Sequence, residues 1–184
     1  MPFTLELATE RWPIAGSFGI SRGSKTEAIV VVAELGDGKA RGRGECVPYA
    51  RYGESVERVV AQINAMRSQL DAGLDRRALQ TAMSPGAARN ALDCAFWDLE
   101  AKQSGRAAHE AAGLPAPHAV TTAFTISLAA PADMAKAAKK ASSRTLLKVK
   151  LGAEGDVDRI AAVRAAAPTA TLIVDANEGW NERN

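Results

Sequence analysis

Hydrophobic and polar positions alternate along the first part of the chain, as they do in strands with one buried face. Runs at about 3–12, 26–35 and 39–46 predict three β-strands. Gly36-Asp37-Gly38 predicts a hairpin between the second and third strands. The polar, glycine-bearing segment 16–25 predicts a long loop between the first two, and long ordered loops often carry function.

Helical spacing follows. Apolar residues recur at i, i+3 and i+4 through residues 54–70, which predicts one amphipathic helix. Ser84-Pro85 predicts the start of a second helix that runs to about Lys102 and ends before Gly105. Its inner side is expected to carry Leu92, Ala95, Phe96 and Leu99, with Cys94 as further core packing.

The order of predicted elements changes after a predicted linker at 113–117. Strands and helices then alternate, at about 119–127, 131–141, 145–150, 156–166 and 171–175. Alternation of this length predicts parallel βαβ units. The predicted organisation is therefore two domains, an antiparallel sheet with helices followed by a βαβαβ segment. Three parallel strands would leave a bare sheet edge, so we expect a truncated chain.

Composition narrows the function classes. The 184 residues are 47% hydrophobic and 24% charged with a net charge of +2, as in ordinary soluble proteins. Basic residues do not cluster, which argues against nucleic-acid or membrane partners. The N-terminus lacks the pattern of a signal peptide, and two cysteines are too few for a disulfide framework. We expect a cytoplasmic protein.

Candidate chemistry lies at two predicted strand ends, Lys148-Val149-Lys150 and Asp175-Ala176-Asn177. Lys148 and Lys150 share one strand face. Two ammonium groups about 7 Å apart repel by roughly 2.4 kcal/mol at an effective dielectric of about 20, which favours a neutral, basic amine. Asp175 could hold a cation beside them. From spacing alone, solvent-facing lysines and a helix-capping aspartate are the more frequent explanation of the pattern.

Several segments together carry a resemblance to a known family. They are Ile20–Ser24, Gly44–Tyr49, Arg51–Ser55, Gly86–Leu99, Leu146–Lys150 and Leu172–Glu178. In these segments the chain resembles the enolase superfamily, in its muconate-lactonizing branch, and is most similar to the dipeptide epimerases of the L-Ala-D/L-Glu type. The resemblance implies an α+β capping domain over residues 1–114. About three βα units of a TIM-type barrel would follow over 115–184.

The family reaction removes and returns the proton α to a carboxylate, through an enediolate held by one Mg²⁺ ion. The resemblance implies that Lys150 is a catalytic base, with Lys148 as its electrostatic neighbour. It makes Asp175 the first of three carboxylate ligands to Mg²⁺, with Asn177 orienting groups at the site. The other ligands and an opposing lysine would lie beyond residue 184, so the chain alone is expected to be inactive.

Substrate contacts are also implied. Arg22, in the loop that closes over the substrate, would hold a substrate carboxylate, while Thr125 and Tyr52 would line the pocket. The expected partner is a small dipeptide, and homo-oligomerisation of the full-length parent is left open. The alternatives are a cycloisomerase or o-succinylbenzoate synthase of the same superfamily, or a non-catalytic truncated fragment.

Overall fold

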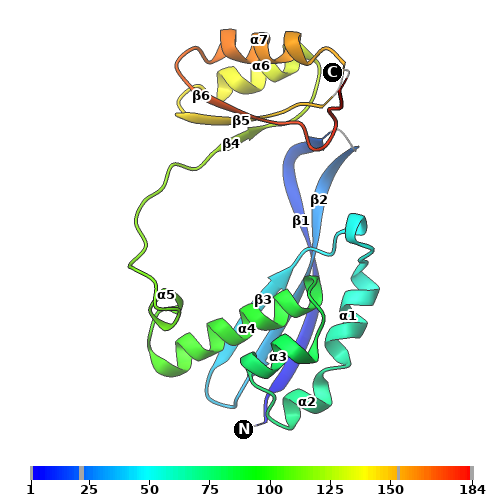
Figure 1. Cartoon of the computed structure of the whole chain (residues 1–184), viewed down its shortest axis with the longest axis vertical. Helices are drawn as coiled ribbons and strands as arrows, with labels where there is room; N and C mark the ends of the chain where they lie inside the picture. The colour runs from blue at the N-terminus through cyan, green and yellow to red at the C-terminus, as the bar shows by residue number, and fades with distance from the viewer. Residues whose placement is uncertain (1, 21–22, 153, 183–184) are drawn as a thin grey trace. The chain divides into compact units, whose positions relative to one another are not determined.

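The computed structural model describes residues 2–20, 23–152 and 154–182. Its contacts divide the chain into two compact units. The first unit comprises residues 1–12 and 28–117, and the second comprises residues 13–27 and 118–184. Figure 1 shows both, coloured along the chain. The domain boundary after residue 114 stays a prediction.

The first unit holds most of an antiparallel sheet and the helices that cover it. Its elements are β1 (Thr4–Ile20) and β2 (Gly23–Gly36), whose ends belong to the second unit, β3 (Arg41–Cys46), the short 3-10 helix η1 (Ala50–Tyr52), α1 (Val56–Asn64), α2 (Arg67–Asp71), α3 (Arg76–Ala82), α4 (Ala87–Ser104) and α5 (Ala108–Ala111). The strand order is β1-β2-β3, and α1 to α4 cover one face of the sheet (Figure 1).

The predicted hairpin between β2 and β3 is confirmed. Gly36 pairs with Arg41 across an antiparallel ladder. The Asp37 carboxylate accepts hydrogen bonds from the Lys39 and Ala40 N–H groups, at 2.8 and 2.7 Å. These bonds lower the pKa of Asp37 to about 2, and the bond from the Ala40 N–H has the largest effect. The turn is thus fixed by an ionised side chain.

Three predictions about the first half of the chain were wrong. Segment 16–25 is not a long loop, because β1 extends to Ile20 and β2 begins at Gly23. Residues 54–70 form two helices, and the sequence hid the break because Ile63, Met66 and Leu70 keep their buried spacing across it. Cys94 is exposed and does not pack in the core.

Helix α4 lies against β3 at unusually short range. A Cβ placed on Gly42 would be 2.1 Å from the Ala95 carbonyl oxygen, and one on Gly44 would be 2.0 Å from the Ala91 oxygen. Only glycine leaves room for backbone to touch backbone here. Alternate β3 residues are therefore glycine because the helix occupies the space of their side chains.

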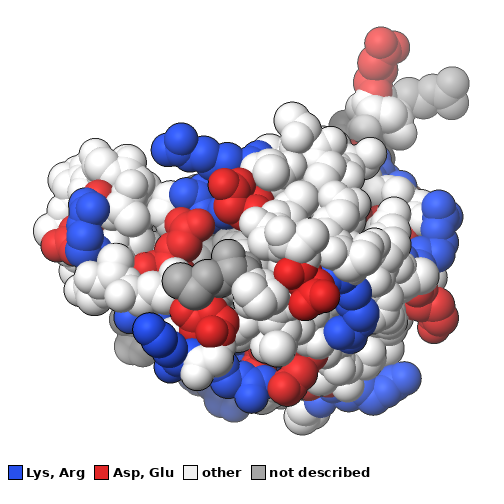
Figure 2. All heavy atoms as spheres, turned by 90° about the horizontal axis from the view of Figure 1, so that it is seen from below, with Lys and Arg blue, Asp and Glu red and all other residues white. Residues whose placement is uncertain are grey.

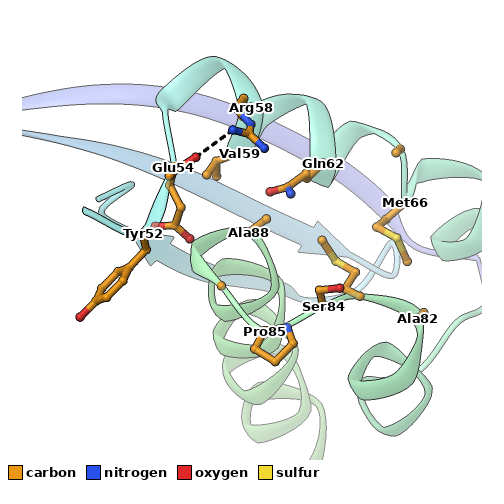
Figure 3. A pocket seen from close by; sticks show the side chains of 14 residues that line it. Tyr52, Glu54, Arg58, Val59, Gln62, Met66, Ala82, Ser84, Pro85 and Ala88 are labelled. Carbon is orange, nitrogen blue, oxygen red and sulfur yellow. Dashed lines mark hydrogen bonds between the residues drawn. The ribbon is translucent and has the colours of Figure 1, made fainter. Parts of the chain in front are cut away.

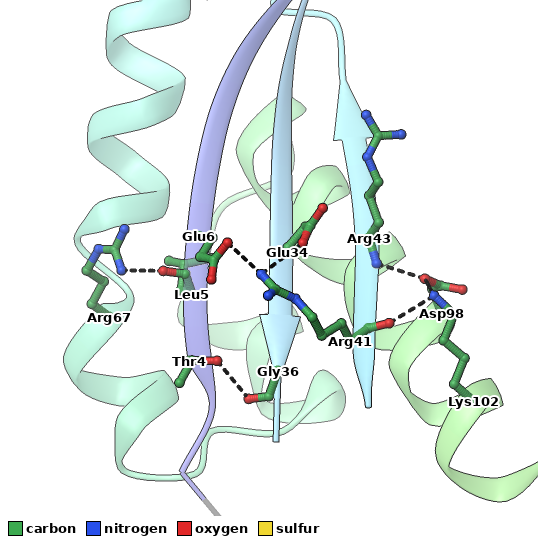
Figure 4. A network of polar contacts seen from close by, with 10 residues as sticks. All are labelled: Thr4, Leu5, Glu6, Glu34, Gly36, Arg41, Arg43, Arg67, Asp98 and Lys102. Atoms are coloured by element: carbon green, nitrogen blue, oxygen red, sulfur yellow. Dashed lines mark hydrogen bonds and ion pairs between the residues drawn. The ribbon is translucent and has the colours of Figure 1, made fainter. Parts of the chain in front are cut away.

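Polar side chains of α4 also cover the edge of β3 (Figure 4). The Arg43 N–H donates to Asp98 Oδ2 at 2.8 Å, and Lys102 Nζ donates to the Arg41 carbonyl oxygen at 2.8 Å. An edge strand with free N–H and C=O groups is a template for aggregation. Asp98 and Lys102 thus form hydrogen bonds with backbone groups of β3 that a further strand would otherwise pair with.

The second unit is built on parallel strands. Its remaining elements are β4 (Phe124–Ile126), α6 (Pro131–Lys140), β5 (Leu146–Lys150), α7 (Asp156–Ala166) and β6 (Thr171–Asp175). The strand order is β4-β5-β6, and both neighbouring pairs are parallel, as predicted. Ile126, Leu147, Val149 and Val163 form a core with apolar residues of α6 and α7. The two helices thus bury the sheet face opposite the lysines.

Charged residues are dispersed. On the face shown in Figure 2, basic and acidic side chains alternate without a large patch of one sign. Within the described residues, no helix has both the length and the apolar character needed to cross a membrane.

Candidate active site

The register of the parallel sheet brings the predicted residues to one place. Lys148 pairs with Thr125 of β4, and Lys150 pairs with Asp175 of β6. Paired residues of parallel strands project to the same face. Lys150 and Asp175 are also the last residues of their strands, so the site lies at the carboxyl ends of β5 and β6.

One carboxylate oxygen contacts both lysines. Asp175 Oδ2 lies 2.7 Å from Lys148 Nζ and 2.8 Å from Lys150 Nζ. The other oxygen, Oδ1, accepts the Asn177 N–H at 2.9 Å. The Lys150 side chain is only 7% exposed, whereas that of Lys148 is 36% exposed. Lys150 is thus the enclosed member of the pair.

The electrostatics differ from the simple sequence argument. That argument had two ammonium groups repelling each other, but here a carboxylate lies between them and offsets the repulsion. Hydrogen bonds from Lys148, then Lys150, then the Asn177 N–H hold the pKa of Asp175 well below its usual range. Asp175 is therefore ionised at neutral pH.

The loops after the two strands touch through their backbones. Gly152 has φ +117°, and a Cβ there would lie 2.3 Å from the Ala176 carbonyl oxygen. A Cβ on Gly179 would lie 2.4 Å from the Gly152 oxygen. Asn177 and Glu178 both have positive φ, at 48° and 62°. Consecutive left-handed residues other than glycine are uncommon, and they are found mostly at functional sites.

Phe18, which the sequence did not indicate as a site residue, also lies near Lys150. Its ring centroid lies 5.6 Å from Lys150 Nζ. Ser127 Oγ donates to the Ser17 carbonyl oxygen at 3.3 Å, and the Leu128 N–H donates to the Gly19 oxygen at 3.2 Å. This end of β1 is therefore tied to the residues after β4. The signal that could have found Phe18 is apolar residues in a segment otherwise assigned to a loop.

The three predicted substrate contacts do not all belong to the unit that holds the lysines. Thr125 is half-buried beside Lys148 in the register. Tyr52 belongs to the first unit, where it is 76% exposed and meets Tyr49 edge to face, with 5.6 Å between centroids. Arg22 lies outside the described residues.

Tyr52 also borders a pocket of about 340 Å³ in the first unit (Figure 3). Glu54 spans part of its wall, because its carboxylate accepts the Tyr49 N–H at 3.0 Å and the Ala87 N–H at 2.7 Å. The second bond satisfies a free N–H at the start of α4. Glu54 thus joins the segment after β3 to that helix.

Asp175 suits a hard divalent cation, since carboxylate oxygens are the ligands that Mg²⁺ prefers. Across the described residues, no group of three or more His, Cys, Asp or Glu side chains is placed to hold a metal. Metal binding by Asp175 therefore stays a prediction.

Comparisons with known proteins identify the relatives of this chain. Residues 3–113 match the family described as "Mandelate racemase / muconate lactonizing enzyme, N-terminal domain". The L-Ala-D/L-Glu epimerase of Escherichia coli (strain K12) is 46% identical over 179 residues, which cover 96% of this chain and 56% of that protein.

Two solved structures extend the likeness to the fold. An enolase family member from Agrobacterium tumefaciens with homology to dipeptide epimerases, with bound sodium and L-Ala-L-Glu, is 55% identical with a TM-score of 0.95; the match covers 100% of this chain and 56% of that one. A dipeptide epimerase from Cytophaga hutchinsonii, complexed with Mg and D-Ala-L-Val, is 29% identical with a TM-score of 0.88, over 98% of this chain and 53% of that one.

These matches bear on the sequence predictions. The chain spans about half the length of the relatives it matches. The predicted fold class is confirmed: a capping domain followed by part of a parallel-strand barrel. The predicted resemblance is confirmed as well.

Proposed function

Because this chain belongs to the mandelate racemase / muconate lactonizing enzyme family, we propose that the whole protein is a Mg²⁺-dependent dipeptide epimerase of the L-Ala-D/L-Glu type. By the whole protein we mean these 184 residues joined to the remaining part of the relatives' length. The observation that carries the proposal is the enclosed Lys150 ammonium, 2.8 Å from a carboxylate at the end of the neighbouring strand.

Lys150 takes the proton from, and returns it to, one face of the substrate α-carbon. Its low exposure supports this role, because exclusion of water strengthens the electrostatic interactions among the reacting groups. The Phe18 ring adds to that shielding. Lys148 is more exposed, and its role is to set the local charge rather than to transfer the proton.

Asp175 is the first ligand to Mg²⁺, and the remaining ligands come from the part of the relatives' length that this chain does not span. Bound Mg²⁺ would stabilise the negative charge that develops on the substrate carboxylate as the α-proton leaves. The Asn177 N–H supports the arrangement by holding the second oxygen of Asp175 in place.

The substrate proposed is a dipeptide with a C-terminal glutamate, on the strength of the Escherichia coli relative. Arg22 would bind a substrate carboxylate, whose planar geometry matches a guanidinium. Thr125 would contact the substrate beside Lys148, and Tyr52 would be a further substrate contact. We place the enzyme in the cytoplasm, where its free cysteines would stay reduced.

The test is deuterium exchange in D₂O, followed by ¹H NMR, with the whole protein and L-Ala-D-Glu. We expect the α-proton signal of glutamate to disappear while L-Ala-L-Glu forms, and both to stop when Mg²⁺ is chelated. N-acetyl-D-glutamate, which lacks the free ammonium group of the dipeptide, is the matched substrate control. No deuterium incorporation with Mg²⁺ present would reject the proposal.

The 184-residue chain by itself is the matched protein control. Its described residues place no group of three metal-ligating side chains together, so it should bind Mg²⁺ weakly, because the ion would keep most of its water. The resemblance places the opposing base in the part of the relatives' length that this chain does not span. Micromolar Mg²⁺ binding by calorimetry, or dipeptide turnover by this chain, would contradict the proposed division of the site.

A further inference from the structure

A second charged pair lies close to the proposed site but has no role in it. Asp156 and Arg159 stand one turn apart at the start of α7, with Arg159 Nη1 3.1 Å from Asp156 Oδ1. Their side chains are only 14% and 17% exposed. Ion pairs of this kind usually lie on a solvated helix face and contribute little. Their burial indicates that they serve another purpose.

The other Asp156 oxygen joins two different loops. Oδ2 accepts the Gly152 N–H at 2.7 Å and the Trp180 Nε1–H at 2.8 Å. Gly152 comes two residues after Lys150, and Trp180 comes five residues after Asp175. One atom therefore fastens the chain just beyond the proposed base to the chain just beyond the proposed metal ligand.

Arg159 carries the connection to a third loop. Its Nε donates to the Ala129 carbonyl oxygen at 2.9 Å, between β4 and α6. Its Nη1 also donates to the Glu154 carbonyl oxygen, within the loop after β5. The pair thus links the segments that follow all three parallel strands of the second unit.

The loops that Asp156 joins are already in backbone contact at Gly152 and Gly179. Contact between backbone atoms without hydrogen bonds has little directional preference. Hydrogen bonds to a charged acceptor are shorter and stronger than neutral ones, and they fix direction. Asp156 therefore supplies the directional part of the loop packing.

We propose that Asp156, held by Arg159, is a positioning residue that keeps Lys150 and Asp175 in their relative placement by fastening the loops after β5 and β6. The inference rests on the proposed function for its catalytic consequence. Its structural half, the fastening itself, can be measured on the 184-residue chain.

The structural test is hydrogen exchange at two amides that Asp156 does not touch. The Asn177 N–H bonds Asp175 Oδ1, and the Leu151 N–H bonds the Asp175 carbonyl oxygen at 3.1 Å. In Asp156→Ala we expect both amides to exchange at least about tenfold faster, as local opening becomes easier. Asp158→Ala is the matched control, since it removes an exposed carboxylate from the same helical turn. Unchanged exchange in Asp156→Ala would overturn the proposal.

The catalytic test uses the whole protein. Small displacements of reacting groups lower turnover by roughly 10- to 100-fold, so Asp156→Ala should lower kcat by that factor with KM changed less than about threefold. Asp156→Asn keeps an oxygen acceptor and should recover most of kcat. Asp158→Ala should match the wild type. Equal effects of Asp156→Ala and Asp158→Ala on kcat would overturn the positioning role.

The two tests separate the two proposals. An inactive wild-type enzyme whose Asn177 and Leu151 amides still respond to Asp156→Ala would reject the proposed function and keep the fastening. An active enzyme whose kcat is unchanged by Asp156→Ala would support the proposed function and reject the positioning role of Asp156.

Discussion

The interface between α4 and β3 and the ends of β5 and β6 both rely on very short contacts, but they achieve them in opposite ways. At the first, side chains are absent: Gly42 and Gly44 let the helix backbone touch the strand. At the second, two lysine side chains contact one oxygen of Asp175. In the first region the backbones of α4 and β3 approach closely because no side chains lie between them. In the second region the side chains approach closely because their charges are opposite.

The difference indicates what each region is for. A neutral backbone contact gives rigid packing at no electrostatic cost, and it breaks when an atom is added. A cluster of charges is costly to enclose and breaks when one member is removed. Such a cluster gains little stability over apolar packing, which is why its presence favours a chemical role.

The largest effect should come from adding one methyl group to the first region. Gly44→Ala places a Cβ against the Ala91 carbonyl oxygen, so α4 must move away from β3. We expect a loss of about 3 kcal/mol or more in the stability of the first unit. Urea unfolding followed by amide NMR signals of that unit would measure it.

Gly36→Ala is the matched control for that experiment. A Cβ there meets the Thr4 side-chain oxygen rather than helix backbone, and a side chain can move. Its cost should be about 1 kcal/mol. If the two variants were equally stable, close backbone packing would not be what the β3 glycines provide.

In the second region, removing a charge should have the next largest effect. Asp175→Asn leaves two ammonium groups facing each other, with that of Lys150 enclosed. Breaking a fully buried pair costs about 3 to 5 kcal/mol, and partial exposure lowers the expectation to about 2 kcal/mol. Signals of the second unit during urea unfolding would report it.

The double variant Lys150→Met/Asp175→Asn sharpens this result. It removes the enclosed charge together with its partner, so it should recover part of the lost stability. A double variant less stable than Asp175→Asn would mean that Lys150 packs through its stem rather than through its charge.

A smaller effect on stability is expected in the turn between β2 and β3. This turn precedes the strand that packs against α4, but it depends on the charge of Asp37. The pKa of Asp37 is lowered from 3.8 to about 2 in the fold, so its contribution is complete above about pH 4. It should decline as the pH falls from 4 to 2 and vanish below. The stability difference between wild type and Asp37→Asn, measured across that range, should follow this course. A difference that grows on acidification would contradict it.

The sequence predicted the strand ends but not the contact between them. Lys150 and Asp175 each follow an apolar run, and that pattern is local. Their meeting depends on the register of β5 and β6, which pairs Lys150 with Asp175 although 25 residues separate them in the sequence. Repulsion between the lysines was therefore predicted, whereas the carboxylate between them was not.

Long-range contacts also account for the missed elements. Gly16 and Gly19 weaken the strand signal locally, yet bonds to Ser127 and Leu128 hold the end of β1 extended near Lys150. Helix α3 was missed because seven residues give little periodicity. The α4 boundaries were predicted well, since Pro85 and Gly105 are local signals, and Gly105 does adopt the left-handed conformation.

The most direct test of the central claim, that Lys150 is the base on one face of the substrate, is deuterium exchange by Lys150→Met in the whole protein. Epimerisation should fall by at least about 100-fold. Exchange of the α-proton should survive for only one of L-Ala-D-Glu and L-Ala-L-Glu, because the opposing base still serves the other face. Wild-type exchange rates with both epimers would contradict the account.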